Sequence, residues 1–359
     1  MTTPPSEAAA GEGPGPESGV VVPSVPRPDG TTPPVTVASQ QAGKVDLVLE
    51  GGGVKGLGLV GAALELSAAG YEFNRFAGAS AGAIVASLLA ALQAAGRPVA
   101  DLETILQTVA YDKFVSHGVL GEVGSGIRLL AHEGLHNGEY LLEWLGGELE
   151  KLGVVTFADL TIDDELIPEE RRYSLVVMVS DITRGKSIRL PWEYAHYGLV
   201  AAEQKVVEAV RASMSIPFFF TPWRVHSKDA EVAGVKYTGG TCIWVDGGML
   251  DNFPIDVFSR GQDLPGRWPT IGVKLSALGP PPARPTDGVF DEAKACLETL
   301  LDNADRFYVI PADAQRTIFV DHGTVRTTDF GITPDQQQLL LRNGRKAARA
   351  FLAHRPPPG

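Results

Sequence analysis

A strand, a glycine-rich turn and a helix follow one another near residue 50, and this pattern constrains the fold more than any other part of the sequence. Residues 45–50 form a short strand-like run that breaks into the glycine-rich stretch 51–56. The apolar run 57–69 that follows predicts a helix, which Gly70 ends. A strand that turns on glycines into a helix is typical of α/β proteins.

The same order of elements repeats at once. Residues 76–77 enter the turn 78–82, and the Ala- and Leu-rich run 83–95 follows it. Since this run is apolar on all sides, it predicts a buried helix. Two such units in succession indicate helices packed on a sheet.

Strand and helix patterns continue to alternate, which predicts an α/β fold of three layers, α/β/α, around a mostly parallel sheet. The last helix has the clearest start, because Thr333, Pro334 and Gln336 occupy the N-cap and the first and third helical positions, and it should run to about His354. The other strands are expected at 173–180, 187–190, 242–245, 270–275 and 306–310, and the other helices at 101–110, 138–152 and 201–212.

Net charge and metal-ligand content exclude several functional classes. The chain has 31 basic and 43 acidic side chains, a net charge of −12, which argues against nucleic-acid binding and against attachment to anionic lipid by charge alone. Transient apolar contact with a membrane surface remains compatible with this charge. Cys242 and Cys296 are too few for a disulfide framework, and His132 and His136 lack the rest of a zinc pattern, so no metal or other cofactor is expected.

The amino-terminal segment 1–43 differs in composition from the rest. Residues 1–42 contain nine prolines and five glycines, which predicts a disordered tail. They lack the basic and apolar regions of a secretory signal, and no run of about 18 apolar residues predicts a membrane span. We expect residues 44–359 to form one catalytic domain in the cytoplasm, with peripheral membrane association and a signal-independent export route left open.

The stretch 51–56 fits two kinds of site. Its sequence, Gly-Gly-Gly-Val-Lys-Gly, satisfies the G-x-G-x-x-G pattern of a dinucleotide site, which also needs an acidic residue at the end of the second strand. Glu72 is the nearby candidate, and it precedes that strand. Alternatively, the backbone N–H groups of Gly51, Gly52 and Gly53 stabilise negative charge on a substrate oxygen, as in an oxyanion hole.

The second turn favours the oxyanion-hole interpretation. Residues 78–82, Gly-Ala-Ser-Ala-Gly, have the G-x-S-x-G pattern of a nucleophile elbow between a strand and a helix. A sharp turn there pushes the Ser80 hydroxyl outward and leaves no room for side chains at Gly78 and Gly82. The alternative is a glycine-rich helix start at which Ser80 is only the N-cap.

A nucleophilic serine needs a base, and the residues leave two candidates. Asp246 ends a predicted strand and is followed by Gly247 and Gly248, and α/β active sites collect at the carboxyl ends of strands. His322 is the late histidine in the Ser-Asp-His order of other hydrolases.

Three glycine-containing segments in this order resemble the patatin-like phospholipase family: 51–56, 78–82 and 246–248. A fourth segment, 212–217, is similar to the small-residue and proline stretch that precedes the aspartate strand in this family. The resemblance covers about residues 44–258.

The resemblance implies a lipid acyl hydrolase with a Ser-Asp dyad that acts on phospholipids or lysophospholipids. Ser80 is then the nucleophile, Asp246 is the base, and the reaction passes through an acyl-Ser80 intermediate. Lys55 stands where the family often has Arg, so it keeps the charge and loses the bidentate geometry. The residues implied to support the site are Lys55, Gly56, Gly78, Gly82, Gly247 and Gly248.

Two other functions stay open on the residues alone. One is a soluble esterase or thioesterase that uses Ser80 with His322, and the other is a nucleotide-binding or non-catalytic interaction protein that uses the 51–56 loop. The apolar segment 216–220 either lines an acyl channel or packs in the core, and the segment 120–126 is either a lid or a surface loop. The final basic helix either lies on a membrane surface or packs on its own domain.

Overall fold

The computed structural model describes residues 43–114, 134–136, 138–259, 266–276 and 311–354, except 328 and 330, with a few isolated positions between 288 and 299. The predicted tail 1–42, the predicted loop 120–126, the predicted strand 306–310 and His132 lie outside the described residues.

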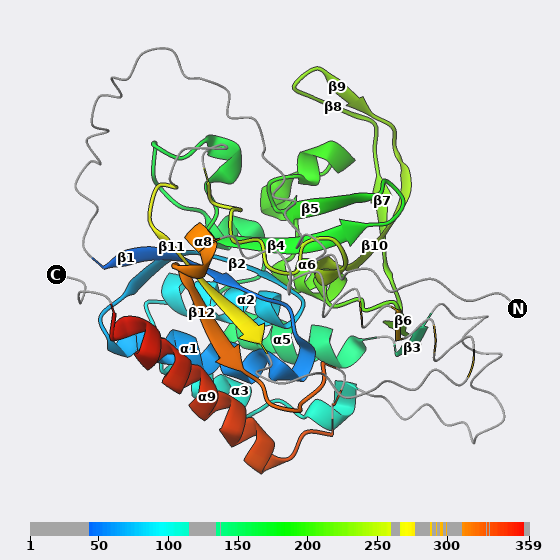
Figure 1. Ribbon diagram of the computed structural model, residues 1–359. Helices are drawn as coiled ribbons and strands as arrows, with labels where there is room; N and C mark the ends of the chain where they lie inside the picture. The colour runs from blue at the N-terminus through cyan, green and yellow to red at the C-terminus, as the bar shows by residue number, and fades with distance from the viewer. Residues whose placement is uncertain are drawn as a thin grey trace, which may run out of the picture. The chain divides into compact units, whose positions relative to one another are not determined.

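A mixed, mostly parallel sheet forms the centre of the domain (Figure 1). Its strands lie in the order β12-β11-β1-β2-β4-β10-β7, and β5 pairs with β4 beside this path. Neighbours from β12 to β4 are parallel, and the pairs β4–β10, β10–β7 and β4–β5 are antiparallel. The strands are β1 (Lys44–Leu49), β2 (Glu72–Ala79), β4 (Leu175–Asp181), β5 (Lys186–Leu190), β7 (Trp223–Ser227), β10 (Gly240–Asp246), β11 (Thr270–Ser276) and β12 (Thr317–Asp321). This sheet, flanked by helices, confirms the predicted α/β class.

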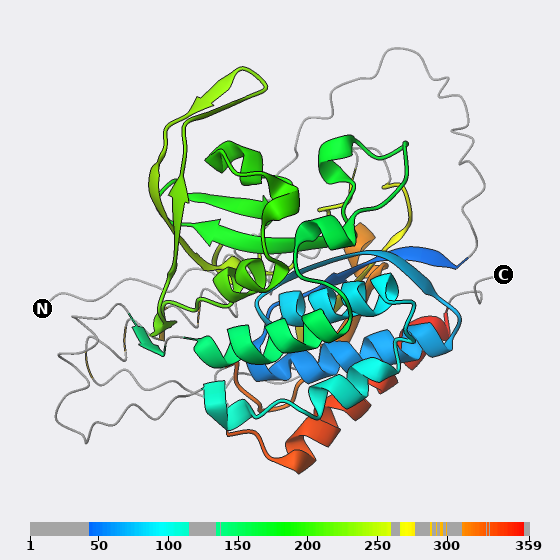
Figure 2. The same cartoon turned by 180° about the vertical axis from the view of Figure 1, so that it is seen from behind.

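Alternate residues of a strand are buried on opposite faces of the sheet, as the two-residue period of a strand requires. Leu47 and Leu49 of β1 belong to the larger core, whereas Val48 between them belongs to a smaller second core. The larger core lies on the side of the helices seen below the sheet in Figure 1, and Figure 2 shows these helices from behind. The smaller core is closed by the segment 255–258. The helices are α1 (Leu57–Ala68), α2 (Ala81–Ala94), α3 (Asp101–Leu106), α5 (Glu139–Lys151), α6 (Val206–Ser213), α8 (Pro311–Ala314) and α9 (Pro334–Leu352).

The edges of β4 explain how two strands far apart in the sequence meet. β5 pairs with one edge over residues 177–181, so β2 and β10 share the other edge. β2 ends with Ala79 opposite Met178. β10 runs the other way and ends with Asp246 opposite Val179. The carboxyl ends of β2 and β10 therefore face each other at consecutive positions of one strand.

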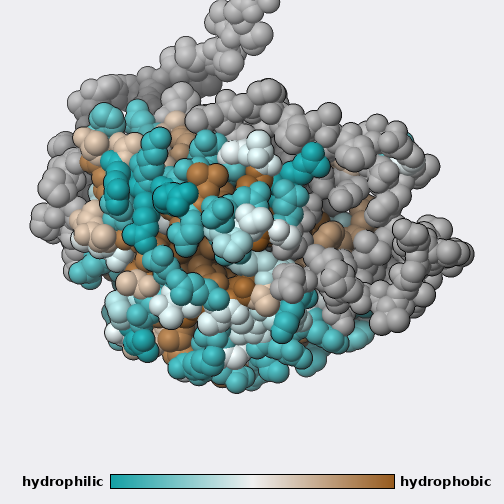
Figure 3. All heavy atoms as spheres, turned by 90° about the horizontal axis from the view of Figure 1, so that it is seen from below, coloured by the Kyte–Doolittle hydropathy of each residue, from teal (hydrophilic) through white to brown (hydrophobic). Residues whose placement is uncertain are grey.

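The final helix, α9, packs on its own domain. A Cβ atom added at Gly344 would overlap the backbone carbonyl of Gly58 in α1, so glycine allows the close approach of the two helices. Arg345 and Arg349 form ion pairs with acidic side chains of α3 and α1. On this side of the molecule polar surface surrounds smaller apolar patches (Figure 3). The structure therefore supports packing rather than membrane docking for α9, and no helix in the described parts of the chain is long and apolar enough to cross a membrane.

The predicted helix 201–212 is wrong in its first part. Ala201–Glu203 forms a single 3-10 turn, and α6 begins only at Val206. Residues 204–206 pair through backbone hydrogen bonds with residues 155–157, which holds them extended. A long-range pairing thus overrides the local helix pattern.

Several short strands have no clear signal in the sequence. Neither β7 nor β12 is predicted, and both lie at the ends of the sheet order. β3 (Gly134–His136) pairs in parallel with β6 (Phe218–Phe220). β8 (Ala230–Val232) and β9 (Val235–Tyr237) form a hairpin that projects at the upper right of Figure 1.

Candidate active site

Ser80 lies at the turn between β2 and α2, where the sequence predicts a nucleophile elbow. Its backbone φ of 49° is in the left-handed region, which is strained for a residue with a Cβ atom and is common at functional sites. A Cβ atom at Gly78 would overlap the backbone of Gly82, so the turn excludes side chains at these flanking positions. Within α2 as described, the Ser80 hydroxyl makes no capping hydrogen bond, so the N-cap interpretation loses its basis.

Ser213, the last residue of α6, holds the elbow from the side. The Ser80 N–H donates to the Ser213 hydroxyl at 2.8 Å, and this hydroxyl donates to the Met178 carbonyl at 2.6 Å. Ser213 and Met178 are fully or almost fully buried. Ser213 thus ties the strained turn to β4. It falls within the family-like segment 212–217, but nothing in the sequence indicates that it contacts Ser80.

Asp246 ends β10 and is 1% exposed. The Gly248 N–H donates to its Oδ1 atom at 2.8 Å. Burial raises the pKa of Asp246 to about 7, although the Ser80 hydroxyl and the Gly248 N–H lower it in part. Oδ2 is buried and accepts no hydrogen bond from the described residues, yet the Ser80 hydroxyl is near enough to lower the pKa of the carboxyl. Catalytic hydrogen bonds are often long before substrate binds.

Asn252 connects the glycine loop with the turn that follows Asp246. Its backbone carbonyl accepts a hydrogen bond from the Gly51 N–H at 3.1 Å, and its Nδ2 donates to the Gly51 carbonyl at 3.3 Å. Its Oδ1 lies against both Gly51 and Gly248, where an added Cβ atom would overlap it. The N–H of Gly51 is therefore engaged. The N–H groups of Gly52 and Gly53 donate to no backbone carbonyl of the described residues and remain candidates for oxyanion donors.

The remaining predicted residues lie in the backbone that frames the site. Gly56 packs against Ala81, the residue after Ser80, and Gly247 packs against the Met178 carbonyl. Lys55 is buried in the turn between β1 and α1. The fold thus gathers all three glycine-containing segments around Ser80 and Asp246.

The topology separates His322 from Ser80. His322 follows β12, and both β11 and β1 lie between β12 and β2. Three strand spacings amount to about 14 Å, which exceeds the reach of an imidazole. Glu72 begins β2 opposite Lys44, at the end of the strand remote from the glycine loop, so it cannot bind a ribose beside that loop. Both alternatives raised by the sequence therefore lose support.

The apolar segment 216–220 divides between core and surface. Ile216 and Phe220 are buried in the larger core. Phe218 is 44% exposed and has a φ of 64°, an unusual conformation for an aromatic residue. Core packing therefore accounts for the two ends of the segment and leaves Phe218 facing outward.

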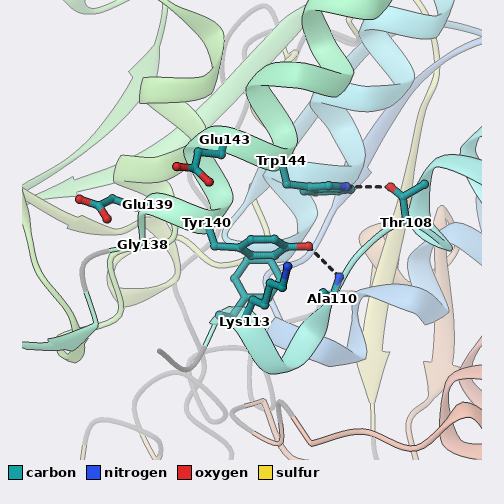
Figure 4. A pocket seen from close by; sticks show the side chains of 9 residues that line it. Thr108, Ala110, Lys113, Gly138, Glu139, Tyr140, Glu143 and Trp144 are labelled. Carbon is teal, nitrogen blue, oxygen red and sulfur yellow. Dashed lines mark hydrogen bonds between the residues drawn. The ribbon is translucent and has the colours of Figure 1, made fainter. Parts of the chain in front are cut away.

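A pocket of about 610 Å³ lies beside the amino end of α5 (Figure 4). The Tyr140 hydroxyl accepts a hydrogen bond from the Ala110 N–H at 2.7 Å, and the Trp144 indole donates to the Thr108 hydroxyl at 2.8 Å. The Lys113 ammonium lies 5.8 Å from the centre of the Tyr140 ring. None of the predicted site residues lines this pocket, so it does not belong to the candidate active site.

Comparison with known proteins gives matches across most of the domain. The model of the patatin-like phospholipase family matches residues 47–259. The uncharacterized protein YqhO of Bacillus subtilis is 33% identical over 316 residues, which cover 86% of this chain and 98% of that protein. An uncharacterized NTE family protein of Mycobacterium tuberculosis is 28% identical over 228 residues, 63% of this chain and 30% of the relative.

Two solved structures resemble the chain at low sequence identity. VipD from Legionella pneumophila aligns with a TM-score of 0.48 and 21% identity, over 89% of this chain and 69% of that one. The type III effector ExoU of Pseudomonas aeruginosa aligns with a TM-score of 0.44 and 16% identity, over 88% of this chain and 53% of that one.

Proposed function

The chain belongs to the patatin-like phospholipase family, and we propose that it is a serine lipid acyl hydrolase that cleaves fatty-acyl esters of phospholipids or lysophospholipids. The observation that carries the proposal is the meeting of β2 and β10 on one edge of β4, which brings Ser80 beside Asp246. The burial of Asp246 and the strained backbone of Ser80 support the same assignment.

In the proposed reaction, the Ser80 hydroxyl attacks the acyl carbonyl carbon and its proton passes to Oδ2 of Asp246. A carboxylate with the usual pKa near 4 is a weak base for a hydroxyl, and the pKa of about 7 at Asp246 makes the transfer less uphill. When the tetrahedral intermediate collapses, the lipid alkoxide leaves with that proton, and an acyl-Ser80 ester remains. Asp246 then deprotonates water, which attacks the ester, releases the fatty acid and restores the Ser80 hydroxyl.

The oxyanion of each tetrahedral intermediate needs donors close to Ser80. The sequence predicts three, from Gly51, Gly52 and Gly53, and we now assign the role to Gly52 and Gly53 because the Gly51 N–H is bonded to Asn252. A single oxyanion donor contributes about 3 kcal/mol to the stabilisation of the transition state. Anchoring Gly51 has a separate use, since it fixes the start of the loop that carries the two donors.

Fatty acid release from mixed phospholipid vesicles tests the proposal. We expect the wild-type protein to release fatty acid with chelator present, and Ser80→Ala and Asp246→Asn to lose essentially all activity. His322→Ala serves as the control and should stay active. Because Asp246 must be deprotonated to act as a base, kcat/KM should rise with pH and level off above an apparent pKa of about 7.

Other outcomes would favour the alternatives. Loss of activity in His322→Ala with retention in Asp246→Asn would replace the dyad by a Ser80–His322 esterase. A wild-type protein that releases no fatty acid, but whose melting temperature rises with nucleotide, would favour a binding module built on the 51–56 loop.

We extend the proposal to the organisation of the chain and its contact with lipid. Residues 44–359 are proposed to form the catalytic domain, and residues 1–43 are proposed to be a tail that plays no part in catalysis. With a net charge of −12, contact with a lipid surface is proposed to be transient and apolar rather than electrostatic. The segment that contains the exposed Phe218, next to the family-like stretch 212–217, is a natural place for such contact.

A further inference from the structure

The pairing of β1 with β11 ends in an unusual way at Glu50, the residue directly before the glycine loop. The Glu50 N–H donates to the Val273 carbonyl at 3.1 Å, as a parallel ladder requires. In a regular ladder the Leu275 N–H would then donate to the backbone carbonyl of Glu50. Here it donates instead to the side-chain Oε2 of Glu50. The carboxylate has taken the place of its own main-chain carbonyl.

This exchange releases the Glu50 carbonyl from the sheet. The carbonyl lies against the start of α2, where a Cβ atom added at Gly82 would come within 2.6 Å of it. The chain therefore leaves β1 at Glu50 and passes beside the nucleophile elbow as the glycine loop. The side chain of Glu50 keeps β11 attached at the point where the backbone turns away.

Lys274 of β11 binds the other oxygen of the Glu50 carboxylate. Its Nζ lies 2.7 Å from Oε1 of Glu50, and both side chains are buried, 6% and 4% exposed. The ammonium also lies 5.2 Å from the centre of the Phe253 ring, in the chain segment after Asn252. A buried carboxylate next to an oxyanion site would oppose the negative charge that forms there, and the adjacent ammonium offsets it.

We infer that Glu50 and Lys274 are positioning residues for the oxyanion loop, a role that rests on the proposed hydrolase function. Glu50 fixes where the loop leaves the sheet, and Lys274 balances its charge. A displacement of about 1 Å in such a loop can lower the rate by two orders of magnitude, because the donors must meet the oxyanion and not the ground-state carbonyl. The substrate itself needs no contact with either residue.

Glu50→Asp is the most direct test, because it keeps the charge and withdraws the carboxylate by one methylene from the Leu275 N–H. We expect kcat to fall roughly 10- to 100-fold with KM changed little, and the affinity for a trifluoromethyl ketone that forms an oxyanion to fall in parallel. The double variant Glu50→Gln, Lys274→Met keeps the side-chain length and an acceptor for Leu275 without a buried charge. It should recover most of the lost kcat.

Arg75→Met provides the matched control. Asp46 of β1 and Arg75 of β2 form another buried ion pair, with Arg75 Nε 3.0 Å from Asp46 Oδ1. That pair lies toward the end of β1 opposite to Glu50. Its loss should lower the melting temperature without the selective fall in kcat. If Glu50 contributes only to stability, Glu50→Asp measured at a temperature where it is folded should keep the wild-type kcat and the wild-type affinity for the inhibitor.

The inference is overturned by wild-type kcat in folded Glu50→Asp, by a double variant as slow as Glu50→Asp, or by an equal fall in Arg75→Met. Labelling of Ser80 by a fluorophosphonate, with Ser80→Ala as the blank, distinguishes failure of the positioning role from failure of the proposed hydrolase function. A wild-type protein that is neither labelled nor active refutes the hydrolase assignment itself. A wild-type protein that is labelled and active, with equally fast labelling of Glu50→Asp, refutes only the positioning role.

Discussion

Replacing Asp246 with asparagine tests the electrostatics of the candidate site independently of any substrate. Burial raises the pKa of the Asp246 carboxyl from 3.8 to about 7, so the folded protein binds this proton more tightly than the unfolded chain does. The stability that comes from the protonated form is complete below pH 3.8 and is lost as the pH rises through about 7. Over the whole shift the loss is about 4 kcal/mol.

Urea unfolding of the wild type and of Asp246→Asn between pH 5 and pH 8 measures most of this loss. Over that interval the linkage relation gives roughly 2–3 kcal/mol, so the stability of the variant relative to the wild type should increase by that amount as the pH rises. The change with pH is the quantity to compare, because the asparagine amide adds a constant offset beside the Gly248 N–H. Asp46, whose pKa burial raises to about 6, is present in both proteins and cancels.

A stability difference that stays constant within about 0.5 kcal/mol from pH 5 to pH 8 would refute this reasoning. It would mean that the Asp246 carboxyl keeps its ordinary pKa in the folded protein. Desolvation could then not explain how Asp246 acts as a base toward Ser80. The apparent pKa in the pH profile of kcat/KM would also be lower than predicted.

Two further substitutions test how the site and the helices are held. Ser213→Ala removes the acceptor of the elbow N–H and the donor to the Met178 carbonyl, so we expect a loss of about 1–3 kcal/mol in urea unfolding and a clear fall in kcat. Ser87→Ala, which removes a buried hydroxyl bonded within α2, should leave kcat near the wild-type value. Gly344→Ala forces a Cβ atom onto the backbone of α1 and should destabilise the protein by roughly 2 kcal/mol in the same assay, whereas Gly147→Ala meets no atom within 4 Å and should be neutral or stabilising. Equal effects of Ser213→Ala and Ser87→Ala on kcat, or equal stability of the two alanine variants at the glycines, would contradict these assignments.

Local signals predict several of the helices well. Thr333 and Gln336 form the capping box expected at the start of α9, and the structure has α1 and α2 where the apolar runs predict them. These features depend on residues within one or two helical turns of each other, so a sequence pattern is enough to identify them.

The failures have a common physical cause in long-range pairing. Residues 201–205 have a helical pattern, but backbone hydrogen bonds to residues 155–157 hold 204–206 extended. The predicted oxyanion donor Gly51 gives its N–H to Asn252, 201 positions away. Neither partner is recognisable from its neighbours in the sequence, since any exposed carbonyl can accept a hydrogen bond.

The sequence by itself predicted the parts of the candidate site: a serine in a sharp, glycine-flanked turn, a glycine loop after a strand, and an aspartate that ends another strand. It did not determine that these would meet. That depended on β5 occupying one edge of β4, which leaves β2 and β10 to share the other edge and end face to face. Strand order is set by the burial of the whole sheet and by hydrogen bonds between distant segments. The tertiary structure alone therefore decided which carboxylate lies beside Ser80, and why the side chain of Glu50 rather than its backbone holds the end of β1 to β11.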